Sequence, residues 1–339
     1  MATEEIMDSS LNILESIRYD NSIESWQYIG YTPQNQANIN TRSSPIQIDI
    51  TASDSYINVS KSFLVIKGEL VRNDSNNPYV VNDDIALINN AMMYLFTEIT
   101  FTLGGDVVER ISSPGQITSM IGYLSLPDDY STSSGLKSCW SKDSTNHANS
   151  LKFTASANAP IAGYIPTENP NYNQGFAVRK GLLMSAEPRG SFSFIIPFDH
   201  IFGFGDYNKV IYNVKHSLLL TRNSSDNPAI YHANGVADGK INLAEITWKV
   251  PHIKPDTVKL MELRGIIESK QTIPIAFPSR TSDAISVPQT QNFTWRVGVT
   301  NGIEKPRWII VAFQTNRTAT QEQNPAVFDH LNVTNACVL

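Results

Sequence analysis

The chain has 339 residues, which is enough for two domains of ordinary size or one large β-domain. Hydrophobic residues make up 41% of it and charged residues only 17%, below the roughly 25% typical of soluble domains. Asn, Ser, Thr and Ile take their place, which favours β-strands joined by polar loops. The net charge of −6 and the pI near 5.5 argue against strong or sequence-specific binding of nucleic acid.

The cysteines, the N-terminal residues and the longest apolar runs indicate where in the cell the protein is expected. Cys139 and Cys337 are the only cysteines, so there is no disulfide framework, and no Cys/His group has zinc spacing. The opening MATEEIMDSSLNILESI carries acidic residues where a secretory signal needs positive charge. No apolar run approaches the about 18 residues of a membrane span. We expect a protein without a membrane span, made in the cytoplasm or nucleus and not secreted.

Six N-x-S/T sequons, the acceptor sequences for glycans in secreted proteins, argue against this location. Without a secretory signal we expect no glycans on them, and two of them lie inside strand-like runs, where a glycan fits poorly. The six sequons begin at Asn58, Asn73, Asn223, Asn292, Asn316 and Asn332.

Residues 1–44 resemble an arm more than part of a barrel. Apolar residues up to Ile17 fall near helical spacing, which predicts a short amphipathic helix. The following stretch, SIESWQYIGYTPQNQANINTRSS, has no sustained period and is rich in turn formers. A poorly ordered terminus and an arm that contacts neighbouring subunits both remain open.

Strand patterns begin at Pro45. Ile46, Ile48 and Ile50 alternate with polar residues, as in a half-buried strand. A long β-rich run covers 56–71, and a hairpin turning at Gly104-Gly105 follows. Residues 82–99 combine a helical turn with a later strand.

From 125 to 175 the chain reads as loop, and strands then resume. Alternating apolar residues predict strands at 192–196, 210–220, 244–250, 258–267, 293–299 and 307–314. No segment after the arm has a sustained 3.6-residue period. Many strands with little helix indicate an all-β sandwich or barrel architecture, and the strands are too many for one barrel of about eight. Pro251 and Pro255 mark the expected junction between two barrels.

The sequence holds no motif for catalysis or cofactor binding, and we predict no catalytic, cofactor-binding or metal-binding residues. G-x-S-x-G, H-E-x-x-H and Walker A motifs are absent. FGFGD at 202–206 has only two glycines and opens no predicted helix, so it does not suit a phosphate. We expect a protein that is not an enzyme.

The titratable residues are scattered. His200 and His330 each follow an aspartate, but adjacent strand residues point to opposite faces, so hydrogen bonding at loop ends is expected. The pairs at 83–84 and 128–129 lack the alternate spacing of a calcium loop, which favours solvated turns. Four tryptophans are expected in the core: Trp140, Trp248, Trp295 and Trp308.

Segments in a fixed order carry a family resemblance. SIESWQYIGYTP, PIQIDITASDSYINVSKSFLVIKGELV and ALINNAMMYLFTEITFTLGGDVVE resemble the opening of the major capsid proteins of Polinton/Maverick elements and adintoviruses, whose relatives occur in invertebrate genomes. LKSCWSKDS, RKGLLMSAEPRGSFSFIIPFDHIF, ITWKVPHIKPD and RWIIVAFQTNRTATQEQNPAVFDHLNVTNACVL are similar to later segments of that family. The matching residues include Tyr56-Ile57-Asn58, Ile88-Asn89-Asn90, Leu95-Phe96 and Gly104-Gly105.

This resemblance implies a hexon-like double jelly-roll, two β-barrels side by side. The expected division is an arm at 1–44, a first jelly-roll at 45–255 and a second at 256–339. The last part has room for about five strands where a complete barrel needs about eight, so the second jelly-roll is expected to be incomplete.

The implied function is that of a structural capsid protein in a virion. The subunit is expected to form a homotrimer, to meet neighbouring capsomers in an icosahedral shell, and to contact a minor capsid or penton protein. One alternative remains open, a host-domesticated β-sandwich module that binds carbohydrate or protein.

Overall fold

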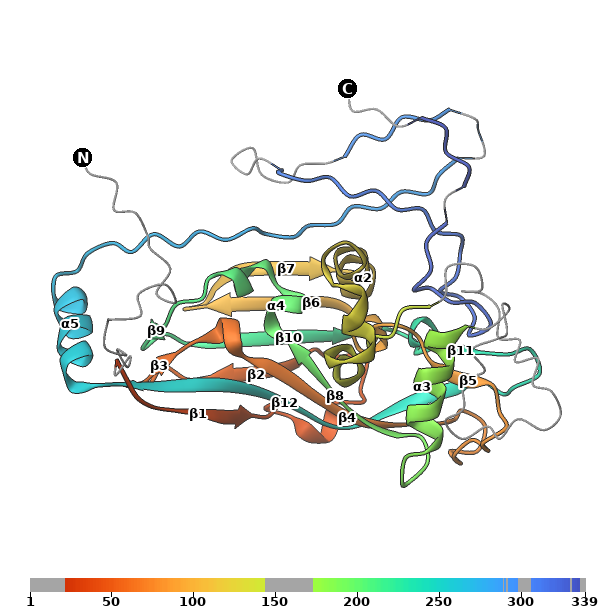
Figure 1. Ribbon diagram of the computed structural model, residues 1–339, viewed down its shortest axis with the longest axis horizontal. Coiled ribbons are helices and arrows are strands. Elements are labelled where there is room, and N and C mark those ends of the chain that lie inside the picture. The colour runs from red at the N-terminus through yellow and green to blue at the C-terminus, as the bar shows by residue number, and fades with distance from the viewer. Residues whose placement is uncertain are drawn as a thin grey trace, which may run out of the picture.

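A β-sandwich of two antiparallel sheets forms the centre of the computed structural model (Figure 1). The structure describes residues 22–143, 173–288, 290, 292–297, 306–329 and 331–335. The first sheet has the order β8-β4-β12-β3-β9, and β1 pairs with the other side of β12. Its strands are β1 (Ile23–Tyr31), β3 (Tyr56–Ile57), β4 (Phe63–Arg72), β8 (Ser191–Pro197), β9 (Ile211–Tyr212) and β12 (Gly239–Pro255).

The second sheet has the order β2-β10-β6-β7 and faces the first. Its strands are β2 (Ile46–Ile50), β6 (Phe96–Leu103), β7 (Asp106–Ser112) and β10 (His216–Arg222). A separate pair, β5 (Ile85–Leu87) and β11 (Ile230–His232), lies at one end of the sandwich (Figure 1).

The core lies between the two sheets, and period-two alternation places it there. In β2 the three isoleucines are buried while Gln47 and Asp49 are half-buried, as predicted. The rings of Phe101 on β6 and Trp248 on β12 meet edge to face with centroids 6.3 Å apart, so side chains from both sheets interlock. The predicted strands at 192–196 and 244–250 are also confirmed.

The predicted hairpin joins β6 to β7. Gly104 and Gly105 both have positive φ, at 65° and 103°, a conformation that L side chains rarely adopt. The segment 82–99 contains the expected helical turn, α1 (Ala91–Tyr94), directly before β6.

The expected arm contains a strand that the sequence did not predict. Residues 23–31 form β1, which pairs antiparallel with the end of β12. Nearly all of β1 is exposed on both faces, so its sequence has no need to alternate apolar and polar residues. The predicted amphipathic helix before Ile17 lies outside the described residues.

Three helices of more than two turns contradict the expectation of none after the arm. Ser113-Pro114 opens α2, where proline occupies a first-turn position that needs no backbone N–H. The Asn173 side chain accepts the Phe176 N–H and caps α3. The helices are α2 (Pro114–Ser125), α3 (Gln174–Met184), α4 (Phe198–Ile201) and α5 (Thr257–Glu268), and short 3-10 helices are η2 (Gln36–Asn38), η3 (Val59–Lys61), η4 (Asp128–Thr132), η5 (Ser134–Ser138), η6 (Gly203–Asp206) and η7 (Asn227–Ala229).

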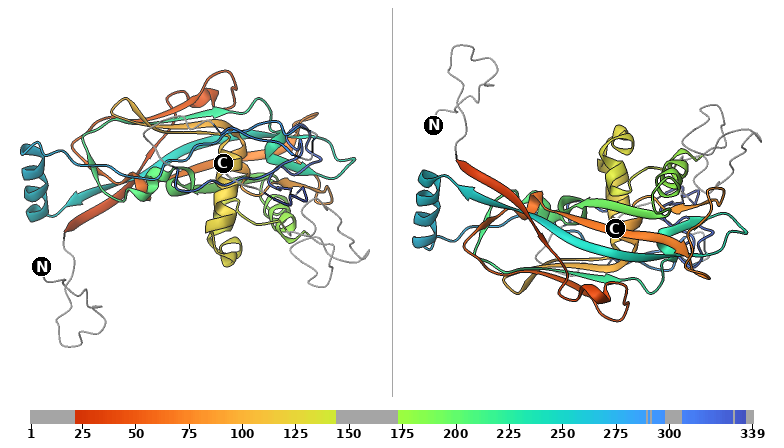
Figure 2. Two further views of the ribbon diagram at one scale, coloured as in Figure 1. Left: turned by 90° about the horizontal axis from the view of Figure 1, so that it is seen from above. Right: turned by 90° about the horizontal axis from the view of Figure 1, so that it is seen from below.

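The strand predicted at 258–267 is wrong, because these residues form α5. The Asp256 side chain accepts the Val258 N–H as an N-cap, and Lys259 pairs with Glu262 one turn on, at 2.6 Å. Most residues of this helix are good helix formers. In both views of Figure 2, α5 projects from the end of the sandwich at which β1 begins.

After Glu268 the described residues, called here the C-terminal segment, run back past the β7 edge toward the β5–β11 end (Figure 1). The strands predicted at 293–299 and 307–314 are not formed where the structure describes these stretches, apart from one isolated bridge between Phe313 and Asp329. Trp308 is 86% exposed, so its predicted burial is wrong, and Trp295 is only half-buried. Trp140 and Trp248 are buried, as expected.

Candidate assembly surfaces

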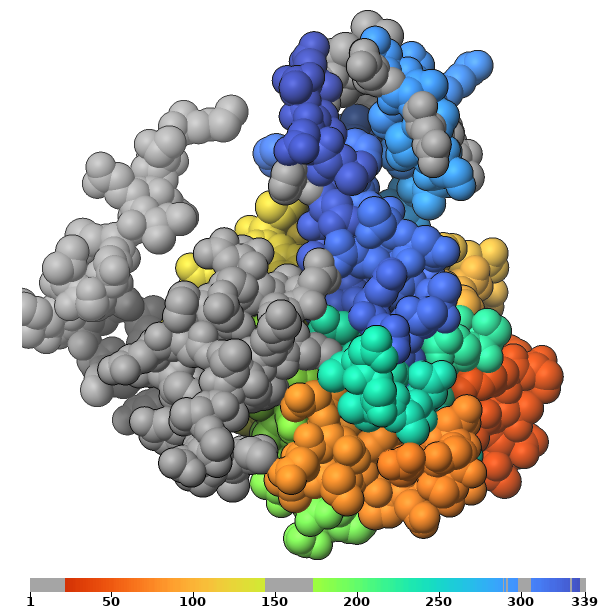
Figure 3. All heavy atoms as spheres, turned by 90° about the vertical axis from the view of Figure 1, so that its right-hand side faces the viewer, coloured from red at the N-terminus to blue at the C-terminus, as the bar shows by residue number. Residues whose placement is uncertain are grey.

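Buried polar side chains anchor the C-terminal segment to the β-sandwich. In Figure 3 this segment (blue) covers part of the chain near β11 (teal). Gln321, which is 2% exposed, accepts the Gly239 N–H at 2.7 Å and donates to the Gly239 carbonyl at 2.7 Å. Its amide also donates to Asn227 Oδ1 at 3.1 Å. The side chain therefore satisfies backbone groups at the start of β12, where β4 is the neighbouring strand.

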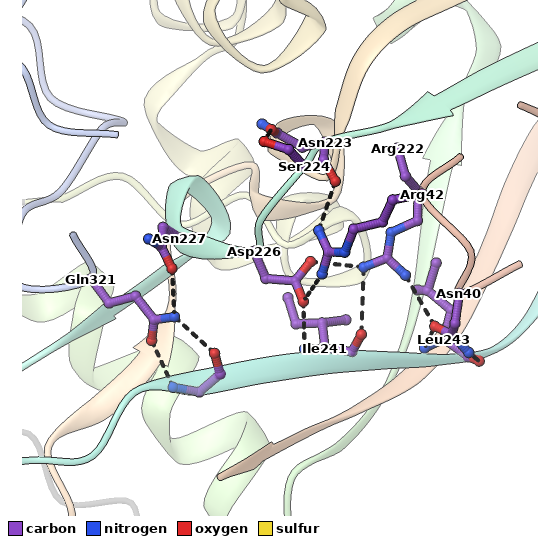
Figure 4. A network of polar contacts seen from close by, with 11 residues as sticks. Asn40, Arg42, Arg222, Asn223, Ser224, Asp226, Asn227, Ile241, Leu243 and Gln321 are labelled. Atoms are coloured by element: carbon purple, nitrogen blue, oxygen red, sulfur yellow. Dashed lines mark hydrogen bonds and ion pairs between the residues drawn. The ribbon is translucent and has the colours of Figure 1, made fainter. Parts of the chain in front are cut away.

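Next to this contact lies a buried cluster centred on Asp226 (Figure 4). Asp226 Oδ1 accepts from Arg222 at 2.7 Å and Oδ2 from Arg42 at 2.8 Å, while the Ile241 N–H donates to Oδ2 at 3.0 Å. Arg222 also donates to Asn40 at 3.0 Å. One carboxylate thus joins the chain after β1, the end of β10 and the start of β12.

A second buried ion pair holds the chain before α3. Arg179 Nη2 lies 2.5 Å from Asp143 Oδ1, and each side chain is 2% exposed. Asp143 Oδ2 accepts from Asn324 at 2.9 Å, and Arg179 Nε donates to the Leu87 carbonyl at 2.8 Å. Asn324 therefore adds a further anchor for the C-terminal segment.

The third anchor is Glu109 on β7. Its Oε1 accepts the N–H groups of Gly203 and Arg280, both at 3.1 Å, and its Oε2 accepts the Phe204 N–H at 3.0 Å. Burial raises the pKa of the Glu109 carboxyl, and the three backbone donors oppose that rise. The FGFGD loop does bind an anionic group, but that group is the protein's own carboxylate.

The Arg280 side chain completes this anchor. Its guanidinium donates to the carbonyl oxygens of His200 at 2.8 Å, Ile201 at 2.9 Å and Asp199 at 3.0 Å. These carbonyls end the short helix α4, where backbone acceptors need partners. Phe277 packs edge to face on Phe204, with centroids 5.0 Å apart.

The described histidines lie on four different elements: His200 on α4, His216 on β10, His232 on β11 and His252 on β12. His200 lies in the short helix α4 and not at a loop end, and its Nε2 contacts Asn90 Oδ1 at 3.4 Å. Burial lowers the pKa of His200 and of His216 to about 4. His147 and His330 lie outside the described residues.

Two of the four aspartates considered for calcium pair with lysines. Asp84 pairs with Lys180 at 2.6 Å and Asp128 with Lys142 at 3.1 Å. Within the described ranges, His, Cys, Asp and Glu form no group of three or more suited to a metal ion. None of the described helices has the length and apolar character needed to cross a membrane.

Apolar side chains gather on two surfaces that the described residues leave uncovered. On α5, Val258 and Met261 are each 68% exposed, and the helix has no buried residue. In the C-terminal segment, four consecutive residues from Trp308 to Val311 are large, apolar and exposed. A concentration of this kind is typical of surfaces that meet another protein surface.

Strand β1 is the other exposed feature. Trp26 is 53% exposed and Tyr28 41%, although they form a row with Phe63, with centroids 5.5 and 5.2 Å apart. The side of β1 that faces away from β12 pairs with no strand in the described part of the chain. The sequence leaves open an arm that contacts neighbouring subunits, but it does not predict that these residues form a strand. It also does not predict the anchors above, because isolated Arg, Asn and Gln residues carry no periodic signal.

Several solved structures are similar to this chain over part of their length. No curated protein matches the chain. Among solved structures, the Sputnik virophage is similar at a TM-score of 0.45 and 11% identity, covering 76% of this chain and 53% of that chain. The Faustovirus major capsid protein gives 0.41 and 8%, covering 75% and 58%, and the mavirus major capsid protein gives 0.39 and 12%, covering 76% and 52%. The chain spans about half the length of these structures.

A family model gives the stronger result. The model described as a double jelly-roll-like domain matches residues 167–339, just over half of the chain. The match includes β8, β10 and β12 of the sandwich as well as the C-terminal segment, and it confirms the predicted fold class. The chain belongs to the double jelly-roll-like domain family.

Proposed function

We propose that the chain is a structural capsid subunit, with no catalytic role, that associates with copies of itself to build a viral shell. The observation that carries the proposal is the uncovered apolar surface of α5 and the C-terminal segment, in a member of a double jelly-roll family. The Trp308 side chain, 86% exposed, does not stabilise an isolated protein. Burying it against a neighbouring subunit would stabilise the contact between them.

The finer features of this function are part of the proposal. The subunit forms a homotrimer, the trimers tile an icosahedral virion with a minor capsid or penton protein, and the source is of the Polinton/Maverick or adintovirus type. The division into jelly-rolls at 45–255 and 256–339 belongs to it too. The end of β12 at Pro255 and the start of α5 at Thr257 are compatible with that division.

Particle mass tests the proposal. Light scattering of the purified protein should give a species of about three times 37.6 kDa, and negative-stain microscopy should show particles of uniform outline. A Trp308→Asp variant should shift the mass toward 37.6 kDa without lowering the melting temperature, because Trp308 has little packing to lose within its own chain. A wild-type protein that stays monomeric across micromolar concentrations would contradict self-assembly.

A further inference from the structure

The outer edge of β1 presents backbone groups that have no strand partner in the described residues. The Pro251 carbonyl of β12 accepts the Asn58 N–H, so Pro251 directs its backbone groups away from β1. Because directions alternate along a strand, His252 directs its groups toward β1, and its register partner Gln27 directs its groups toward β12. It follows that Trp26 and Tyr28 direct their N–H and C=O groups outward.

The strand is complementary to itself. It has nine residues, and Gln27 is the middle one. An antiparallel copy in the register that brings the aromatic residues of the two strands together places Gln27 opposite Gln27, and Trp26 opposite Tyr28 twice. In this register the outward groups of Trp26 meet those of Tyr28, which is the hydrogen-bonded kind of pair. Cross-strand aromatic pairs of this sort stabilise a sheet.

The charges and shape of β1 do not oppose such pairing. Glu24 is the only charged residue in the strand, and Lys254 of the same chain lies 2.7 Å from it. The strand has no proline, no lysine and no inward-pointing charge of the kinds that protect exposed edges. A bulge between Ile23 and Ser25 limits regular pairing to the residues after it.

We propose that β1 pairs antiparallel with β1 of a second copy of this chain, about a two-fold axis at Gln27. The contact joins two β12-containing sheets into one and aligns their rows of Trp26, Tyr28 and Phe63. It is an isologous interface, in which each subunit contributes the same surface. The proposal rests on the proposed function to the extent that it names one contact between subunits of the shell.

Cysteine crosslinking tests the register. In the full chain with Cys337→Ser, a Gln27→Cys substitution places two thiols across a non-hydrogen-bonded pair, at about 4.5 Å between Cα atoms, which a disulfide spans. Mild oxidation should convert most of the protein to a species of twice 37.6 kDa on a non-reducing gel. Cys139 is buried, so it does not compete.

Matched variants define the geometry. Ser25→Cys and Ile29→Cys should each give only the uncrosslinked band when oxidised alone. A mixture of the two variants should crosslink, because residue 25 faces residue 29 in this register. Trp26→Pro removes an outward N–H and should abolish crosslinking of Gln27→Cys, while Trp26→Ala keeps that N–H and should only reduce it. Both should melt near the wild-type temperature, because Trp26 is 53% exposed.

Three results would overturn the inference. The first is a Gln27→Cys protein that does not crosslink. The second is crosslinking of Gln27→Cys only after residues 1–21 are deleted, which would assign the edge to the chain's own N-terminus. The third is crosslinking of Ser25→Cys alone, which would mean another register. If particles form but Gln27→Cys does not crosslink, the proposed function is supported and the β1 contact is contradicted. If Gln27→Cys crosslinks but no particles form, the β1 contact is supported and the proposed function is contradicted.

Discussion

Glu109 on β7 and Arg280 in the C-terminal segment are joined by a backbone hydrogen bond, and the positive charge of Arg280 opposes the rise in the pKa of Glu109. The Arg280 N–H donates to Glu109 Oε1 at 3.1 Å, and the Arg280 guanidinium donates to the last carbonyls of α4. Because Glu109 also accepts the N–H groups of Gly203 and Phe204, its buried carboxylate joins β7, η6 and the C-terminal segment. This arrangement predicts that the part of the C-terminal segment around Arg280 detaches when either partner is lost, while Gln321 and Asn324 still hold the later part.

The Arg280→Met variant tests this anchor. It removes the donors to the α4 carbonyls and leaves Glu109 without its nearest positive charge, which costs about 1–3 kcal/mol. Limited proteolysis should cleave the segment at 270–288 roughly 10-fold faster than in the wild type, as local opening becomes easier. Arg264→Met, on the exposed face of α5, is the control and should leave the cleavage rate unchanged. Equal cleavage in both variants would contradict the anchor.

The Asp226 cluster should matter far more to stability than a surface ion pair of the same residue types. Asp226→Asn leaves Arg222, whose side chain is 1% exposed, without its carboxylate, and should lower the free energy of unfolding by about 3–5 kcal/mol. Asp74→Asn breaks the exposed Arg72–Asp74 pair and should change little. Urea denaturation measures both, and a small effect of Asp226→Asn would mean that water reaches the cluster.

Two tryptophans give a direct comparison of buried and exposed packing. Trp248 is fully buried and donates to Ser62 Oγ at 3.0 Å, so Trp248→Ala should cost roughly 3–5 kcal/mol and lower the melting temperature by about 10 °C. Trp308→Ala should leave the melting temperature of the isolated subunit unchanged, because the ring is 86% exposed. Differential scanning calorimetry of dilute protein separates the two, and similar losses would mean that Trp308 is covered in solution.

His216 should make the fold sensitive to mild acid. Burial lowers its pKa from 6.5 to about 4, so the unfolded chain takes up a proton as pH falls below 6.5 while the folded chain does not. Stability is therefore lost as pH falls from 6.5 to 4, by about 2 kcal/mol between pH 7 and pH 5. His216→Leu should lose this part of the pH dependence. If urea midpoints of the variant and wild type change equally with pH, His216 is not the cause.

Strands with one buried face could be predicted from the sequence. The isoleucines of β2 alternate because the sheet buries every second side chain, and the same reason holds for 244–250 of β12. Strand β1 could not be found in this way, because both of its faces are exposed and its partner lies more than 200 residues away. Helix α2 did carry a signal, Ser-Pro at its first turn, which the strand reading overlooked.

The errors near the C-terminus have a different cause. The apolar residues at 258–267 and 307–314 predict strands, yet they form an exposed helix and an irregular segment. Hydrophobicity alone cannot distinguish a side chain buried in its own domain from one left for a neighbour. The anchors Gln321 and Asn324 were beyond prediction, since their partners at 239 and 143 are distant in sequence.

The pairing of β1 with β12 also determines when the first sheet can be completed during synthesis. β1 ends at Tyr31, and its partner strand is complete only once Pro255 has been added. At the usual rate of about 5–20 residues per second, translation leaves this first strand without its neighbour for roughly 10–45 s. Nascent chains on one polysome therefore cannot join through a finished sheet until Pro255 has been added, because the edge that we assign to contacts between copies forms only then.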